Sequence, residues 1–159
     1  MPASVRSCGG CTACCKPLDA YDGVFHKPAG VWCKHCNIGQ GCGIYETRPS
    51  VCKGFRCEWL KGFGEEADRP DKMRVILDFH KLGFFDEGVC EIWEVSEGAL
   101  GRPYTARATR WMIEHNIPVT HRPLGGKRMK TFLPPTLMVK EILEVLAEDN
   151  IELGSLADL

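Results

Sequence analysis

The stretch CGGCTACC, residues 8–15, decides how the first third of this 159-residue chain can fold. A C-x-x-C spacing lets two sulfurs reach one metal ion, and small residues between them leave backbone amides free to turn toward those sulfurs. Side chains of neighbouring residues diverge by about 100° on a helix. A helical turn over residues 12–16 would therefore place Cys11 and Cys15 on one face and direct Cys14 elsewhere. This pattern indicates either a two-metal site or one cluster with thiols to spare.

Five more cysteines lie in the stretch WCKHCNIGQGCGIYETRPSVCKGFRC, residues 32–57. Trp32, Ile44, Tyr45 and Phe55 lie among them and can supply the dry shell that thiolate sites require. The arginines at positions 48 and 56 can offset thiolate charge or donate hydrogen bonds to sulfur. Two such groups in close succession predict a metal-thiolate centre far more strongly than a lone C-x-x-C pair does.

Nine of the ten cysteines fall within the first 57 residues, and only Cys90 lies beyond them. The N-terminal sequence MPASVRS has no apolar signal segment, and no apolar run approaches the ~18–20 residues that span a membrane. We therefore expect a cytoplasmic protein without a membrane partner. Because the cytosol keeps thiols reduced, clustered cysteines in such a chain indicate metal ligands rather than disulfides.

Charge is balanced over the whole chain but not within it. The formal net charge is −1, which argues against nucleic acid as a partner, since proteins that bind it usually carry a basic excess. Residues 1–60 nevertheless hold seven basic and four acidic side chains when thiols are counted as neutral. This local excess fits a centre of negatively charged thiolates without identifying the metal.

Glycine and proline interrupt residues 1–60 so often that no apolar period emerges, and a segment of this kind normally needs a metal to fold around. Regular elements are expected from residue 73 onward. In chain order they are strands over 73–80 and 89–95, a helix from Pro103 to Asn116, strands over 117–122 and 127–133 joined by a turn at 123–126, and a last helix after Pro134-Pro135 with apolar positions 138, 142, 145 and 146.

This order predicts an α+β fold in two parts that form one compact unit. Residues 1–60 make an irregular Cys-rich metal-binding segment. Residues 61–159 make a small antiparallel sheet with two helices packed on one face, and residues 62–71 are a candidate linker between the parts. The sequence contains no glycine-rich phosphate loop, nucleophile elbow or HExxH motif, so a binding or structural role is favoured over an enzyme.

The C-x-x-C-x-x-C-C start, a cysteine nine residues before a C-x-I-Y element, and the R-P-x-x-C element at residues 48–52 resemble the YkgJ family of cysteine-cluster proteins. That family is described as zinc- or iron-chelating, and the resemblance covers residues 8–57. It implies eight metal ligands: Cys8, Cys11, Cys14, Cys15, Cys33, Cys42, Cys52 and Cys57. Cys36 departs from the pattern, where an aliphatic residue is usual, so it is either a further ligand or a bystander. A similar element occurs in flagellin lysine methylases, where an iron–sulfur cluster is implied.

Zinc is the first expectation for the metal. Eight thiols divide evenly into two closed Cys₄ sites, with Cys14 and Cys15 contributing one thiol to each, and closed sites organise a fold rather than catalyse. The alternative is an iron–sulfur protein that acts as a redox carrier or as part of a methyl-transfer enzyme, since a cluster takes four cysteines and leaves others free. Metal storage or delivery is a third, weaker interpretation. Metal ions are the only partners that the sequence predicts.

The remaining candidate residues have plainer interpretations. Cys90 lies on an alternating strand and is expected in the core. His26 and His35 are expected at the surface, because the thiols already suffice as ligands. The three histidines beyond residue 60 lack any spacing typical of a catalytic triad or a metal site: His80, His115 and His121.

Overall fold

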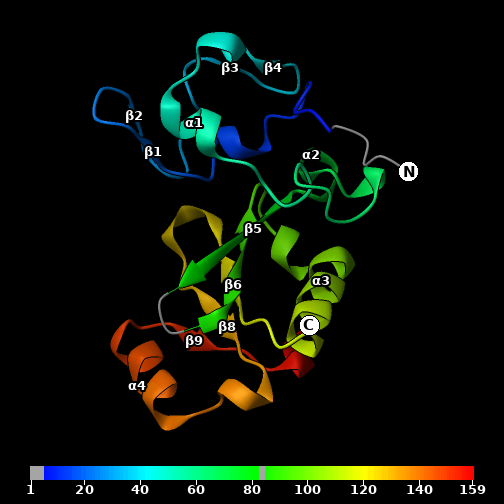
Figure 1. Cartoon of the computed structure of the whole chain (residues 1–159), viewed down its shortest axis with the longest axis vertical. Coiled ribbons are helices and arrows are strands. Elements are labelled where there is room, and N and C mark those ends of the chain that lie inside the picture. Colours follow the sequence, from blue (N-terminus) through cyan, green and yellow to red (C-terminus); the bar gives the residue numbers. More distant parts are fainter. Residues whose placement is uncertain (1–5, 83–84) are drawn as a thin grey trace.

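The computed structural model describes residues 6–82 and 85–159, and its main feature is a five-stranded sheet that lies against a cysteine-rich segment (Figure 1). The strands are hydrogen-bonded in chain order. They are β5 (Val75–Leu82), β6 (Phe85–Glu94), β7 (Val119–Arg122), β8 (Lys130–Phe132) and β9 (Glu152–Leu153).

The sheet is mixed, so the expectation of an antiparallel sheet is wrong. β6 and β7 are parallel, because α3 (Pro103–Glu114) crosses between them and returns the chain to the same end of the sheet. β8 and β9 are parallel for the same reason, with α4 (Lys140–Glu148) in the crossover. The sequence pattern does not predict β9, whose two residues are too few to show an alternation.

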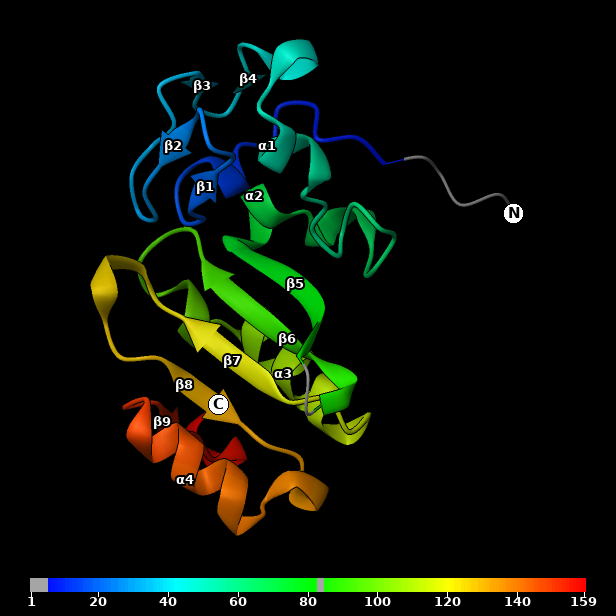
Figure 2. The ribbon, with the colours of Figure 1, turned by 60° about the vertical axis from the view of Figure 1, so that its left-hand side comes forward.

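The other expected elements are present, which confirms an α+β fold. β5 and β6 pair antiparallel, and β7 and β8 form the expected hairpin around the turn at Leu124–Gly126. Pro103 occupies the first turn of α3, and the left-handed Asn116, with φ 62°, follows its end. α4 lies beside β9, at the end of the molecule away from the cysteine-rich segment, and none of its residues is buried (Figure 2).

The main core lies between α3 and one face of the sheet. Successive strand residues point to opposite faces, so Leu77 and its cross-strand partner Ile92 face the helix together. Met112 and Ile113 from α3 pack against this face. Cys90 is fully buried in the same cluster, which confirms its assignment to the core. Trp111 of α3 lies at the edge of this core, because it is 42% exposed and stacks on His115 at a centroid distance of 3.9 Å.

The opposite face of the sheet contacts the cysteine-rich segment at one end. Ile76 and Val95 are 1% and 7% exposed and pack with Ala13 of that segment. The segment itself contains only short elements, as its glycine and proline content predicts. They are β1 (Ala20–Tyr21), β2 (His26–Lys27), β3 (Cys36–Asn37), β4 (Gly41–Cys42) and α1 (Ser50–Gly54).

Residues 62–71, the candidate linker, are structured rather than extended. They contain a 3₁₀ turn at Glu66–Asp68 and the start of α2 (Pro70–Met73). The Arg6 guanidinium donates hydrogen bonds of 2.8 and 2.9 Å to the carbonyls of Trp59 and Phe63, which ties the start of the chain to this connection. Among the described residues, no helix has the length and apolar character needed to cross a membrane.

Candidate metal centre

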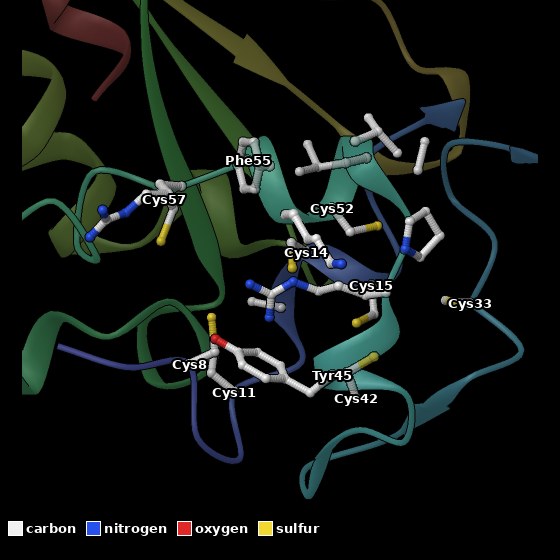
Figure 3. Close-up of a pocket in the computed structure, with 18 of the residues that line it drawn as sticks. Cys8, Cys11, Cys14, Cys15, Cys33, Cys42, Tyr45, Cys52, Phe55 and Cys57 are labelled. Carbon is white, nitrogen blue, oxygen red and sulfur yellow. The ribbon is translucent and has the colours of Figure 1, made fainter. Parts of the chain in front are cut away.

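Eight cysteines scattered over fifty residues of sequence line one cavity of about 430 Å³ (Figure 3). They are the eight that the motif singles out: Cys8, Cys11, Cys14, Cys15, Cys33, Cys42, Cys52 and Cys57. Cys36 is not among the residues that line it. All nine of these thiols are free and half-buried.

Local backbone structure directs the first four thiols into the cavity. The Cys11 amide donates a 2.8 Å hydrogen bond to the Cys8 carbonyl, closing a turn in which Gly9 has a φ of +50°. A 3₁₀ turn at Ala13–Cys15 then follows, closed by a 3.0 Å bond from the Cys15 amide to the Thr12 carbonyl. Both adjacent thiols line the same cavity, so the chain does not separate Cys14 and Cys15 into distant sites.

The second group of cysteines lies on and beside a hairpin and a short helix. β3 and β4 place Cys36 opposite Cys42 in the antiparallel register. α1 carries Cys52, whose amide donates a 3.0 Å bond to the carbonyl of Pro49. Cys57 follows three residues after α1, where the chain turns toward β5.

The two cysteine groups are held together by backbone contacts. The Cys33 amide donates a 2.9 Å hydrogen bond to the carbonyl of Cys15. Gly41, with a φ of +120°, lies so close to the first loop that a Cβ there would be 2.9 Å from the Gly9 carbonyl oxygen. The hydroxyl of Thr12 accepts a 3.1 Å bond from the Gly39 amide. The cavity therefore depends on two glycine-containing loops that meet backbone to backbone.

The thiols lie toward two ends of the cavity. In Figure 3, Cys57 lies at one end with Cys8 and Cys11, Cys33 lies at the other with Cys42, and Cys14 and Cys15 lie between the ends. In the part of the chain that the structure describes, no three of the sulfurs all lie within 4.8 Å of one another. Among the described residues, the only three candidate donor atoms that all lie within 4.8 Å of one another belong to the Asp78, His80 and Glu91 side chains on β5 and β6.

A buried lysine, which the sequence analysis did not single out, supplies positive charge beside the thiols. Lys27 lines the cavity and is only 6% exposed. Its ammonium donates bonds of 3.0, 3.0 and 3.1 Å to the carbonyls of Lys16, Pro28 and Val31. Burial lowers the pKa of Lys27, whereas negative charge on Cys33 and Cys15 acts in the opposite direction. A buried cation held by neutral carbonyls indicates a cavity that is built for anions.

Arg48 contributes a second cation. Its guanidinium lies 3.7 Å from the centroid of the Tyr45 ring, and its buried Nε has no hydrogen-bond partner within the described part of the chain. The contact with Tyr45 raises the pKa of Arg48, and charge on Cys8 and Cys42 adds to the effect. This confirms that Arg48 lies among the thiols, as its place in the sequence predicts.

Burial disfavours the ionised form of several of these thiols, whereas the pKa of one thiol is lowered. Burial raises the pKa of Cys11 and Cys52, and it raises the pKa of Cys57 to about 11. The pKa of Cys14 is instead lowered to about 7, chiefly by a hydrogen bond from Cys15, whose own pKa is raised. A bound cation is the usual way to stabilise several thiolates in such surroundings.

The walls of the cavity are largely apolar, as expected for a thiolate site. Ile44, Tyr45 and Phe55 line it, together with Ile76 from β5. Trp32 does not, although its place in the sequence predicts that it would; the ammonium of Lys16 lies 5.8 Å from its ring. The contribution of Ile76 has no signal in the sequence, because it depends on how the segment packs on the sheet.

The two histidines of the segment differ in their position relative to the cavity. His26 is exposed and faces Asp19 at 3.5 Å, whereas His35 is half-buried and lines the cavity beside Phe25. The surface assignment is therefore right for His26 and incomplete for His35.

No family model, no curated protein and no solved structure matches this chain. The resemblance to the YkgJ family therefore stays a prediction that rests on the spacing of the cysteines.

Proposed function

We propose that this protein binds metal through the eight cavity thiols and that two zinc ions in Cys₄ sites organise its N-terminal segment. The observation that carries the proposal is the single cavity lined by eight thiols from residues 8–57, with Cys36 outside the lining. The donor chemistry fits the metal, because thiolates in a dry, cation-flanked cavity are the usual ligands of structural zinc.

The distribution of the thiols supports two sites. Burial raises the pKa of Cys57, and charge on Cys11, Cys14 and Cys8 adds to the effect, which supports placing these four thiols in one group. They form the first ligand set. Burial raises the pKa of Cys52, and charge on Cys14, Cys33 and Cys42 adds to the effect, so Cys14 lies near both groups. The second proposed ligand set comprises Cys33, Cys42, Cys52 and Cys15, so that the adjacent pair supplies one thiol to each ion.

Zinc binding requires the four sulfurs of each ligand set to move closer together. Four sulfurs at about 2.3 Å from one ion are about 3.8 Å apart in a tetrahedral site. The turns that carry the cysteines are short and glycine-rich, so small backbone adjustments can bring each set together. Metal binding is then coupled to the folding of the segment.

An iron–sulfur cluster is the second candidate, and the continuity of the cavity favours it. All eight thiols share one space rather than two separated pockets, and a space of about 430 Å³ has room for a polynuclear cluster. Such a cluster would use four thiols and leave the others reactive. Redox transfer or a part in methyl transfer would then be the working hypotheses.

Cysteine alkylation read out by mass spectrometry tests both candidates on the full chain. With zinc bound, we expect the eight cavity thiols to resist the reagent while Cys36 reacts, and a chelator should make all eight reactive. Cys90 is fully buried and serves as the control that stays protected until the chain unfolds. Four protected cavity thiols in a coloured protein would support the cluster. Eight thiols that react as fast as Cys36 before chelation would overturn both.

A further inference from the structure

A second group of metal-ligating side chains lies outside the cysteine cavity, on β5 and β6. Asp78 and His80 are two residues apart on β5, so they point to the same face of the sheet. Glu91 on β6 is the direct cross-strand partner of Asp78. One donor atom from each of the three side chains lies within 4.8 Å of the other two.

This face is the one that α3 leaves open. Leu77 and Phe79 alternate with Asp78 and His80 along β5 and pack in the core cluster on the opposite face. The side chains of Asp78, His80 and Glu91 are 25%, 34% and 11% exposed, so solvent reaches the group from one side.

The distances within the group leave room for an ion. The His80 Nδ1 atom lies 3.8 Å from a carboxylate oxygen of Asp78, and its Nε2 atom lies 4.0 Å from an oxygen of Glu91. Both distances exceed the 2.7–3.2 Å range of ordinary N–H···O hydrogen bonds. One ion can bind only one of the two imidazole nitrogens, and with one donor atom taken from each side chain the three atoms still lie within 4.8 Å of one another.

Arg122 on β7 fixes the orientation of one carboxylate. Its Nε donates a 2.7 Å hydrogen bond to Oε1 of Glu91, and its Nη2 contacts the same oxygen. The second oxygen, Oε2, is the one that faces His80. A metal-ligating carboxylate is commonly held in this way by an outer partner, which leaves its other oxygen directed at the ion.

We propose that Asp78, His80 and Glu91 bind a divalent transition-metal ion, at a site separate from the thiols. One imidazole nitrogen and two carboxylate oxygens suit ions such as manganese or zinc, whereas the cavity offers soft sulfur. Three protein ligands leave coordination positions open to water or to a small anionic ligand. The site does not depend on the metal content of the cysteine cavity.

Manganese is the probe that separates the two sites, because Mn²⁺ favours oxygen and nitrogen over thiolate. The full-length protein, purified with its native metal content, is titrated with Mn²⁺ while the electron paramagnetic resonance signal of the free ion is recorded. We expect about one ion bound per chain. H80A and D78N should each weaken binding at least about tenfold.

Matched controls separate coordination from general charge effects. E97Q removes a carboxylate and H26A removes a histidine, both at exposed positions away from the group, and neither should change Mn²⁺ affinity more than about twofold. Thermal melting verifies that every variant is folded. The proposal is overturned if the wild-type chain takes up no Mn²⁺, or if folded H80A and D78N bind it like the wild type. In that case the group is an ion-pair network only.

Discussion

The backbone amide of Cys33 donates a 2.9 Å hydrogen bond to the carbonyl of Cys15. These residues are eighteen positions apart, and each belongs to a different cysteine group. The bond joins the groups through main-chain atoms, so the shape of the cavity does not rest on the thiols alone. Metal and backbone are therefore expected to stabilise the segment together.

Gly41 provides a test of the loop contact that closes the cavity. A Cβ at this position would lie 2.9 Å from the Gly9 carbonyl oxygen, and the φ of +120° disfavours any other residue. We expect Gly41→Ala to lower the free energy of unfolding by about 1–3 kcal/mol. The measurement is chemical denaturation of the metal-loaded protein. Gly54→Ala is the control, because a Cβ at Gly54 meets no atom within 4 Å, and an equal loss in both variants would refute the loop contact.

Cys33 and Cys36 offer a matched comparison within one C-x-x-C element. Cys33 lines the cavity and Cys36 does not. We expect Cys33→Ser to release about one metal ion per chain and to lower the melting temperature, whereas Cys36→Ser keeps the metal. Elemental analysis of the two purified variants provides the measurement. If Cys36→Ser loses as much metal as Cys33→Ser, the ligand assignment is wrong.

A substitution at Lys27 tests whether the cavity holds negative charge. Replacing it by methionine leaves three carbonyls without their donor, which should lower the free energy of unfolding by about 1–3 kcal/mol. Loss of the cation also makes thiolates less stable, so protons should displace the metal at a higher pH than in the wild type. Metal release during acid titration gives the readout. The exposed Lys34→Met is the control, and an unchanged release pH in Lys27→Met would argue against thiolate charge beside Lys27.

The buried side chain of His121 leads us to predict how the stability of the sheet changes in acid. Burial, aided by Lys130, lowers the pKa of this histidine to about 4, and Thr109 shares a 2.8 Å hydrogen bond with it. The folded state thus favours the neutral ring. Its contribution to stability is complete above about pH 6.5 and is lost as the pH falls toward 4, by on the order of 3 kcal/mol.

The matching variant is His121→Gln, which can still bond Thr109 but does not titrate. Unfolding is measured in both proteins from pH 7 to pH 4, so that acid release of metal affects them equally. As the pH falls, the free energy of unfolding of the wild type should decrease more than that of the variant. A constant difference over this range would show that His121 is not buried in its neutral form.

The sequence was sufficient to predict the cysteines that line the cavity and most strands of the sheet. The resemblance to the YkgJ family implies the eight cysteines that line the cavity, and β5 shows its alternation directly. The direction of β7 relative to β6 could not be predicted from the sequence in the same way. It depends on α3 crossing over the sheet, which is a tertiary feature that periodicity does not record.

Two groups of candidate functional residues could not be predicted from the sequence, because each group is brought together only by the fold. Lys27 looks like any surface lysine in a polar segment, and only the fold shows that it is buried beside thiols. Asp78 and His80 have the spacing of neighbours on one strand face, which is a detectable signal. Their third partner, Glu91, becomes visible only once the register of β5 and β6 is known.

Elemental analysis of the wild-type chain, purified without oxygen and without added metal, tests the central claim most directly. Two Cys₄ sites predict about two zinc ions per chain and negligible iron, removed together with the fold of the N-terminal segment by a strong chelator. About four iron atoms with matching acid-labile sulfide would replace zinc by a cluster in the same cavity. A folded chain that contains neither metal, and that takes up neither on reconstitution, would contradict the account.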